Sequence, residues 1–170
     1  FVCVGGRCFD PTGAVTLDVP GEVRPALSGD GRFAAWEDAT AIVRRALPGG
    51  KDEVLAQVTD LAPLLPGYGT GARHAPIVGP RGFVYVPVDQ GVLVLGDGPP
   101  RLLADRDSLA AEAGLCPFMN EFDADMLARE RPVDFGVVGF DPADDRLLAR
   151  FVTSHETYVV SLGVGRPPVV

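Results

Sequence analysis

The chain has 170 residues, of which 46% are hydrophobic and 22% are charged. This size and composition are typical of one globular domain that buries a core without disulfide or metal staples. No apolar run approaches the roughly 18–20 residues of a membrane span, and the first four residues are too short and lack the basic flank of a signal peptide, so we expect a cytoplasmic protein.

The negative charge lies mainly in the second half of the chain. The formal net charge is −8, with 9 acids and 8 bases in residues 1–82 against 14 acids and 7 bases in residues 83–170. A field of this sign repels nucleic acid and anionic membrane and attracts basic proteins. We therefore expect no nucleic acid and no membrane among the partners. The acidic half is either a solvated face or a docking surface for a basic protein.

Residues 1–28 are predicted to form strands and turns. Residues 2–9 fit a hairpin over Gly5-Gly6, with Cys3 opposite Cys8 in a non-hydrogen-bonded pair whose geometry permits a disulfide. In a cytosolic protein we expect both thiols to be reduced. The turn at residues 10–13 precedes a strand over 14–19, and residues 22–27 are expected to pair back onto it.

Two helices are predicted between residues 36 and 65. After a turn at residues 28–31, apolar side chains fall at helical spacing from Trp36 to Leu47, and Pro48 ends the segment. A second apolar stripe runs over residues 52–65, with a proline near its end that loosens the last turn. Trp36, the single tryptophan, is expected to anchor the first helix to the core.

The stretch 82–96 is the clearest structural signal. Two apolar runs flank Asp89-Gln90-Gly91, which predicts a bulged hairpin with Gly91 in the left-handed position. Because both faces of each run are apolar, the hairpin is expected near the middle of the core. Pro87 donates no hydrogen bond, so it fits such a strand only at a bulge or a non-bonded position.

The rest of the chain completes the prediction of one α+β domain. The remaining elements are a short strand over 101–104, a helix to Ala113, a helix from Asp123 to Glu130, strands over 133–140, 147–152 and 157–162, and a Pro/Gly-rich tail from about 163. We find no internal repeat. The expected architecture is a mainly antiparallel sheet whose central hairpin, about 83–95, packs against several short helices.

The Gly-rich loop 66–82 is the first candidate for chemistry. It has no periodic pattern, and loops of this length are usually functional or mobile. Backbone amides of its glycines with Arg73 and Arg81 could hold an anionic group, His74 could transfer a proton, and Tyr68 could orient the ligand. The loop lacks the Lys-Ser/Thr pair of a phosphate-binding loop and the strand–glycine–helix order of a dinucleotide fingerprint. The alternative is an ordinary surface connection.

Other reactive residues form no complete constellation. His155 beside Glu156 could act as a general base, but a polar turn explains the pair, and no serine has the flanking glycines of a hydrolase nucleophile. Cys116 is expected to be buried and unreactive. The cysteines and histidines lack metal-ligand spacing. We therefore expect no catalytic residue, no metal and no cofactor.

The acidic residues support the preferred hypothesis. A small, acidic, non-catalytic interaction protein of the inhibitor, immunity or regulatory type would bind a basic partner through the second half of the chain. The residues expected to carry this contact are Asp123, Asp125, Asp141, Asp144, Asp145 and Glu156. The alternative hypothesis is an enzyme or ligand-binding domain that recognises a small anionic molecule through the loop 66–82.

Overall fold

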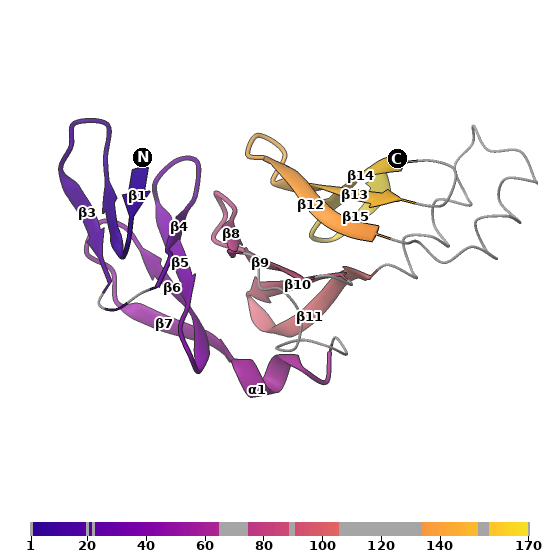
Figure 1. Cartoon of the computed structure of the whole chain (residues 1–170), viewed down its shortest axis with the longest axis horizontal. Helices are drawn as coiled ribbons and strands as arrows, with labels where there is room; N and C mark the ends of the chain where they lie inside the picture. Colours follow the sequence, from indigo (N-terminus) through magenta and orange to yellow (C-terminus); the bar gives the residue numbers. More distant parts are fainter. Residues whose placement is uncertain are drawn as a thin grey trace, which may run out of the picture.

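The computed structural model describes residues 2–19, 21, 23–64, 75–88, 91–105, 134–152 and 157–169. These residues form fifteen strands and one short helix. The strands make four small antiparallel sheets that follow one another in chain order (Figure 1). The prediction of an α+β domain with several helices is therefore wrong, because the described chain is nearly all β. The helices predicted over 107–113 and 123–130 lie outside the described residues.

The first sheet has three strands in the order β1-β2-β3 and confirms the N-terminal hairpin. β1 (Val2–Val4) and β2 (Arg7–Phe9) pair across Gly5-Gly6, and Cys3 lies opposite Cys8. The two cysteines are joined in a disulfide, where we expected reduced thiols. β3 (Val15–Asp18) pairs with β2.

The second sheet replaces the first predicted helix and the first six residues of the second. It consists of β4 (Ala26–Leu27), β5 (Phe33–Glu37), β6 (Ala41–Ala46) and β7 (Asp52–Gln57). β4 pairs with β5, so Ala26 and Leu27 do not pair back onto β3, as we expected for the segment 22–27. Of the second predicted helix, the structure retains α1 (Val58–Leu61) among the residues that it describes.

A tight turn after β5 explains why the first helix does not form. The Asp38 carboxylate accepts hydrogen bonds from the backbone N–H of Thr40 at 2.7 Å and of Ala41 at 2.8 Å. This local bonding reverses the chain in the middle of the apolar run, and it competes directly with helical hydrogen bonds. Trp36 consequently lies on a strand, 4% exposed, and not on a helix.

The third sheet contains the predicted central hairpin, made of β9 (Val84–Val88) and β10 (Gly91–Gly96). β8 (Ile77–Val78) and β11 (Gly98–Asp105) flank it, so the third strand predicted over 101–104 exists and is longer than expected. The last residues of the predicted loop 66–82 form β8 and the turn that follows it. β8 pairs only with the first two residues of β9, so Pro87 lies where its missing N–H interrupts no ladder.

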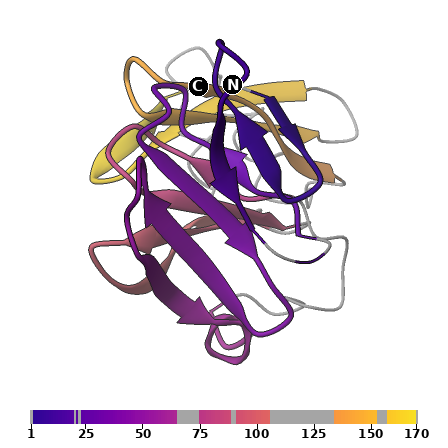
Figure 2. The ribbon, with the colours of Figure 1, turned by 90° about the vertical axis from the view of Figure 1, so that its left-hand side faces the viewer.

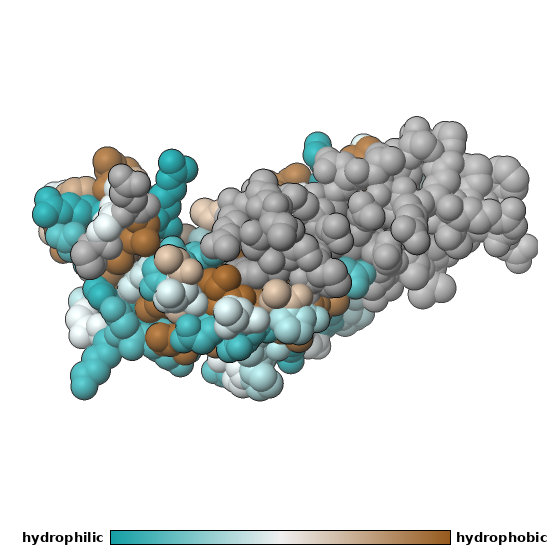
Figure 3. Space-filling model, turned by 60° about the horizontal axis from the view of Figure 1, so that its bottom comes forward, coloured by the Kyte–Doolittle hydropathy of each residue, from teal (hydrophilic) through white to brown (hydrophobic). Residues whose placement is uncertain are grey.

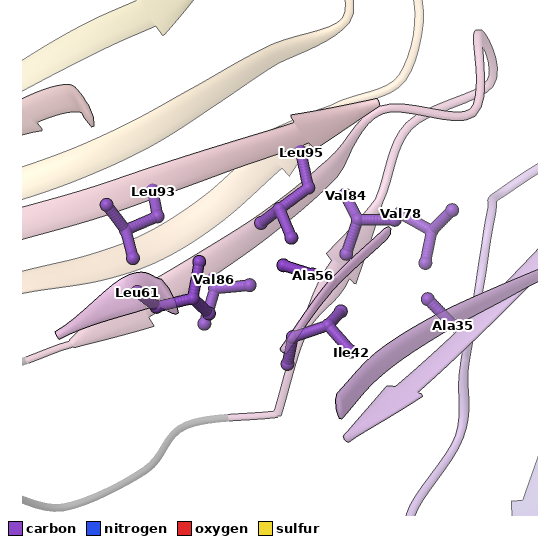
Figure 4. Close-up of a cluster of buried hydrophobic side chains, with 9 residues drawn as sticks. All are labelled: Ala35, Ile42, Ala56, Leu61, Val78, Val84, Val86, Leu93 and Leu95. Carbon is purple, nitrogen blue, oxygen red and sulfur yellow. The ribbon is translucent and has the colours of Figure 1, made fainter. Parts of the chain in front are cut away.

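Both faces of the hairpin are buried, as predicted. Val84, Val86, Leu93 and Leu95 pack with residues of the second sheet and α1 (Figure 4). The alternating residues of the two strands face the fourth sheet, where Tyr85 joins a separate apolar cluster. The third sheet is thus enclosed between its two neighbours, which accounts for the absence of polar alternation in its sequence.

The fourth sheet confirms three predicted strands and adds one. β12 (Asp134–Asp141), β13 (Arg146–Val152) and β14 (Thr157–Gly163) form a meander. Residues 166–169, which we expected in an unpaired tail, form the edge strand β15 (Arg166–Val169).

Each sheet packs face to face on the next one. A third apolar cluster, which includes Cys8, Leu17, Trp36 and Val43, joins the first sheet to the second. Figure 2 shows the first two sheets in front, with the third and fourth behind them. The core is therefore divided into layers between successive sheets.

The structure repeats, although the sequence gives no repeat. The second and third sheets each begin with a two-residue strand and a turn, and in the fourth sheet a turn follows the longer first strand β12. Each of these turns places one residue in the left-handed region. These residues are Gly31 (φ 70°), Gly82 (φ 82°) and Asp145 (φ 52°). We call the segments 28–32, 79–83 and 142–145 the opening turns. The three turns differ in length and in residue type, so a comparison of their sequences does not reveal the repeat.

Candidate functional site at the opening turns

The first two opening turns are built by the same backbone hydrogen bonds. The N–H of Ser28 donates to the carbonyl of Phe33, and the N–H of Gly31 donates to the carbonyl of Ser28. In the third sheet, Gly79 donates to Phe83 and Gly82 donates to Gly79 in the same way. A residue in the left-handed region is needed to close each turn, and glycine adopts that conformation without steric cost.

Side chains complete the turn of the second sheet. The buried Ser28 hydroxyl donates to the Asp30 carboxylate at 2.7 Å and accepts the N–H of Phe33 at 3.0 Å. Partial burial works to raise the pKa of Asp30, but hydrogen bonds from Ser28 and Arg32 outweigh it and hold that pKa below its usual value. Asp30 therefore remains ionised and fixes the turn.

The three opening turns meet in space. The Arg32 guanidinium donates to the Pro80 carbonyl at 3.2 Å, which ties the first turn to the second. A methyl group placed on Gly29 would lie 3.6 Å from Cβ of Pro142, so the first turn also lies against the third. Segments more than a hundred residues apart in the sequence thus form one surface, which we call the opening-turn surface.

The second and third turns are joined by a buried ion pair. Asp145 is 4% exposed, and its carboxylate accepts a hydrogen bond from Nε of Arg81 at 2.6 Å. The hydroxyl of the fully buried Tyr85 lies 3.3 Å from the same carboxylate. Burial and the neighbouring Asp145 charge raise the pKa of Tyr85, so its hydroxyl stays protonated and acts as a donor. This arrangement compensates a charge that would otherwise be costly to bury.

Gly79 allows the Asp145 carboxylate to reach this position. A Cβ on Gly79 would lie 2.1 Å from Oδ1 of Asp145, far inside van der Waals contact. The left-handed backbone of Asp145 is tolerated because aspartate, like asparagine, visits this region more readily than other side chains. The ion pair therefore depends on two backbone features as well as on the charges.

The structure separates the acidic residues that we predicted to act together. Asp145 is internal and paired with Arg81, which was itself predicted to hold an anionic ligand. Asp144 is exposed and Asp141 is partly exposed. The Asp141 carboxylate accepts the N–H of Ala143 at 2.9 Å and so shapes the turn, as expected of a turn former.

The other predicted site residues lie outside the described residues. They are Tyr68, Arg73 and His74 of the loop, and Asp123, Asp125 and Glu156 of the acidic set. His155 and Cys116 lie outside as well.

Sequence reasoning missed the role of Tyr85 and the pairing of Arg81 with Asp145. A glycine before Pro80-Arg81 and an aspartate run after Pro142 do predict turns. Nothing local predicts that the two turns touch, because they are more than sixty residues apart.

Within the described ranges, no group of three or more His, Cys, Asp or Glu side chains is arranged to hold a metal ion. Those ranges also contain no helix with the length and apolarity to cross a membrane. Comparison with protein-family models gives no match, and comparison with curated proteins gives none either. Function must therefore be argued from the geometry.

Proposed function

We propose that the chain is a non-catalytic protein-interaction module built as an arc of β-propeller blades. A propeller consists of four-stranded antiparallel sheets arranged radially around a centre. The support for this assignment is the succession of up-and-down sheets that pack face to face, of which the second and third begin with turns built by the same backbone hydrogen bonds. Scaffolds of this kind present loops from several sheets on one surface, and such loops commonly carry the binding residues.

The opening-turn surface is the proposed contact for a basic partner. The observation that carries this proposal is that the turn 142–145 buries one of its two carboxylates and exposes the other. It holds Asp145 inside while Asp144, with the neighbouring Asp141, faces solvent on a surface shared with two other turns. No ion pair joins Asp141 or Asp144 to a base among the described residues. Their charges are therefore available to a partner.

The side of the molecule that carries β7 and α1 is a weaker candidate for a binding surface. Figure 3 shows hydrophilic and hydrophobic residues mixed over the described part of that side, without one continuous apolar area. Stable apolar docking usually needs a contiguous patch. This contrast favours a polar, charge-guided contact at the opening turns.

The test compares two double variants with the same loss of charge. Asp141→Asn with Asp144→Asn removes the exposed charges but keeps the side-chain acceptor that shapes the turn. Asp60→Asn with Asp97→Asn is the control, because both residues are exposed and lie on other parts of the chain. Basic proteins retained at low salt are purified, and their association rates with each variant are measured.

The first double variant is expected to associate several-fold more slowly than the control at low salt, and the difference should close as salt rises. Equal association rates for the two double variants would refute the proposed surface.

A further inference from the structure

The sequence contains the triplet Gly-Asp-Gly twice. Residues 29–31 belong to the opening turn of the second sheet, and residues 96–98 connect β10 to β11. An aspartate before a glycine can close a succinimide ring with the next backbone nitrogen, because glycine has no Cβ to hinder the approach of the side-chain carboxyl group. The two triplets are identical, so a difference in their reactivity must come from the structure around them.

Hydrogen bonds hold both reacting groups of the first triplet. The Asp30 carboxylate accepts the Ser28 hydroxyl at 2.7 Å, the backbone N–H of Arg32 at 3.2 Å and Nε of Arg32 at 2.5 Å. The N–H of Gly31, which would have to attack Cγ of Asp30, donates to the carbonyl of Ser28 at 2.8 Å. The lowered pKa of Asp30 also reduces the fraction of protonated carboxyl, the form that loses water when a succinimide closes.

The second triplet lacks these restraints. Asp97 is the single residue between β10 and β11, and it is exposed. Its carboxylate makes no hydrogen bond or ion pair with any other residue that the structure describes. Gly98 has φ 100°, and a Cβ placed on it would meet no heavy atom within 4 Å. The Asp97 side chain and the Gly98 nitrogen therefore have room to turn toward each other.

We propose that Asp97 is a site of spontaneous covalent modification, at which aspartate converts to isoaspartate through a succinimide. The Gly98 nitrogen forms a bond to Cγ of Asp97, and the carboxyl hydroxyl leaves with the amide proton as water. Water then adds to the other ring carbonyl, the main-chain carbon of Asp97, and the bond from that carbon to the Gly98 nitrogen breaks. The main chain now runs through Cβ and Cγ, and the product has the mass and charge of the original residue.

The modified turn lies beside the opening turn 79–83. A Cβ placed on Gly96 would lie 2.6 Å from Cδ1 of Phe83, so the start of the triplet packs on that ring. The Arg81 guanidinium lies 5.3 Å from the centroid of the same ring. Isoaspartate at position 97 therefore lengthens the backbone next to residues that hold the third and fourth sheets together. The reaction needs only water, so it does not depend on the function proposed above.

The test follows both triplets in one sample. The folded 170-residue chain is incubated at neutral pH below its melting temperature, and electron-transfer fragmentation of its peptides distinguishes isoaspartate from aspartate. Isoaspartate is expected to form at Asp97 at least about tenfold faster than at Asp30, the factor that one charge-assisted hydrogen bond is worth. In concentrated urea the two rates should become similar, because the triplets are identical. Asp97→Glu should abolish the product at position 97, because its ring would need six members.

A second variant tests the protection of the first triplet. Arg32→Ala removes the Nε donor from the Asp30 carboxylate, so the rate at Asp30 should rise several-fold while the rate at Asp97 stays the same. Arg7→Ala, at an exposed arginine of the first sheet, is the matched control and should change neither rate. Equal effects of the two arginine variants on Asp30 would overturn the explanation by hydrogen bonding.

Three results would overturn the proposal itself. They are no isoaspartate at Asp97 in the folded chain, equal rates at the two aspartates in the folded chain, and a preference for Asp97 that persists in urea. Asparagine closes the same ring with loss of ammonia, so the control variant with Asp60→Asn and Asp97→Asn is measured on freshly purified protein.

Discussion

The ion pair between Arg81 and Asp145 is predicted to stabilise the contact between the third and fourth sheets. Replacing Arg81 by Ala leaves the Asp145 carboxylate 4% exposed with only Tyr85 as a side-chain donor among the described contacts. Breaking a fully buried pair typically costs about 3–5 kcal/mol. The Arg81 side chain is 49% exposed, so water replaces part of its effect, and we expect a loss of about 1–3 kcal/mol in the free energy of unfolding.

Urea denaturation at neutral pH measures this loss, and the exposed pair of Arg7 with Asp18 provides the control. Both of those side chains are more than half exposed, so Arg7→Ala should cost no more than about 0.2–1 kcal/mol. A double-mutant cycle with Asp145→Asn isolates the pair, since Asn tolerates the left-handed backbone and keeps an acceptor for Tyr85. If Arg81→Ala costs no more than Arg7→Ala, or the coupling is zero, the ion pair does not stabilise this contact.

Two further predictions concern single turns. Gly79→Ala should destabilise the protein by more than about 1 kcal/mol, because the added Cβ would lie 2.1 Å from the Asp145 carboxylate. Gly136→Ala is the control, because a Cβ there meets open space and should change the melting temperature little. Similar melting temperatures for the two variants would contradict this prediction. Hydrogen bonds from the N–H groups of Thr40 and Ala41 lower the pKa of Asp38 in the folded state below 3.8, so its contribution to stability is present above that pH and is lost as pH falls through the lowered pKa. Urea unfolding of Asp38→Asn and wild type should therefore converge between pH 5 and pH 2, roughly the acid range of a carboxyl group, and a constant difference would argue against the assignment.

Turn chemistry was the part of the fold that could be predicted from neighbouring residues. The hairpin over Gly5-Gly6 and the turn at Ser28 form where expected, because glycine and aspartate impose local conformations whatever surrounds them. The hairpin in the third sheet also forms, but Gly91 lies in β10 and not in the left-handed position that we predicted for it. The register of Cys3 with Cys8 followed from the same argument.

The helix predicted over residues 36–47 is wrong for an identifiable reason. Both faces of β5 and β6 pack on neighbouring sheets, since Ala35 and Ile42 contact the third sheet while Trp36 and Val43 contact the first. A strand buried on both faces loses its polar alternation and can also satisfy helical spacing. The Asx turn at Asp38 was the overlooked local signal against a helix.

The features of the candidate site also separate into those that local sequence determines and those that the fold determines. By itself, the sequence determined where the chain turns, where the apolar hairpin lies and which half carries the negative charge, because these depend on neighbouring residues and composition. Tertiary structure alone decided that three opening turns share a surface, and that Asp145 is internal and paired with Arg81 while Asp141 and Asp144 stay outside. These features arise from contacts between segments far apart in the chain, and the pairing of such segments is set by how the sheets stack.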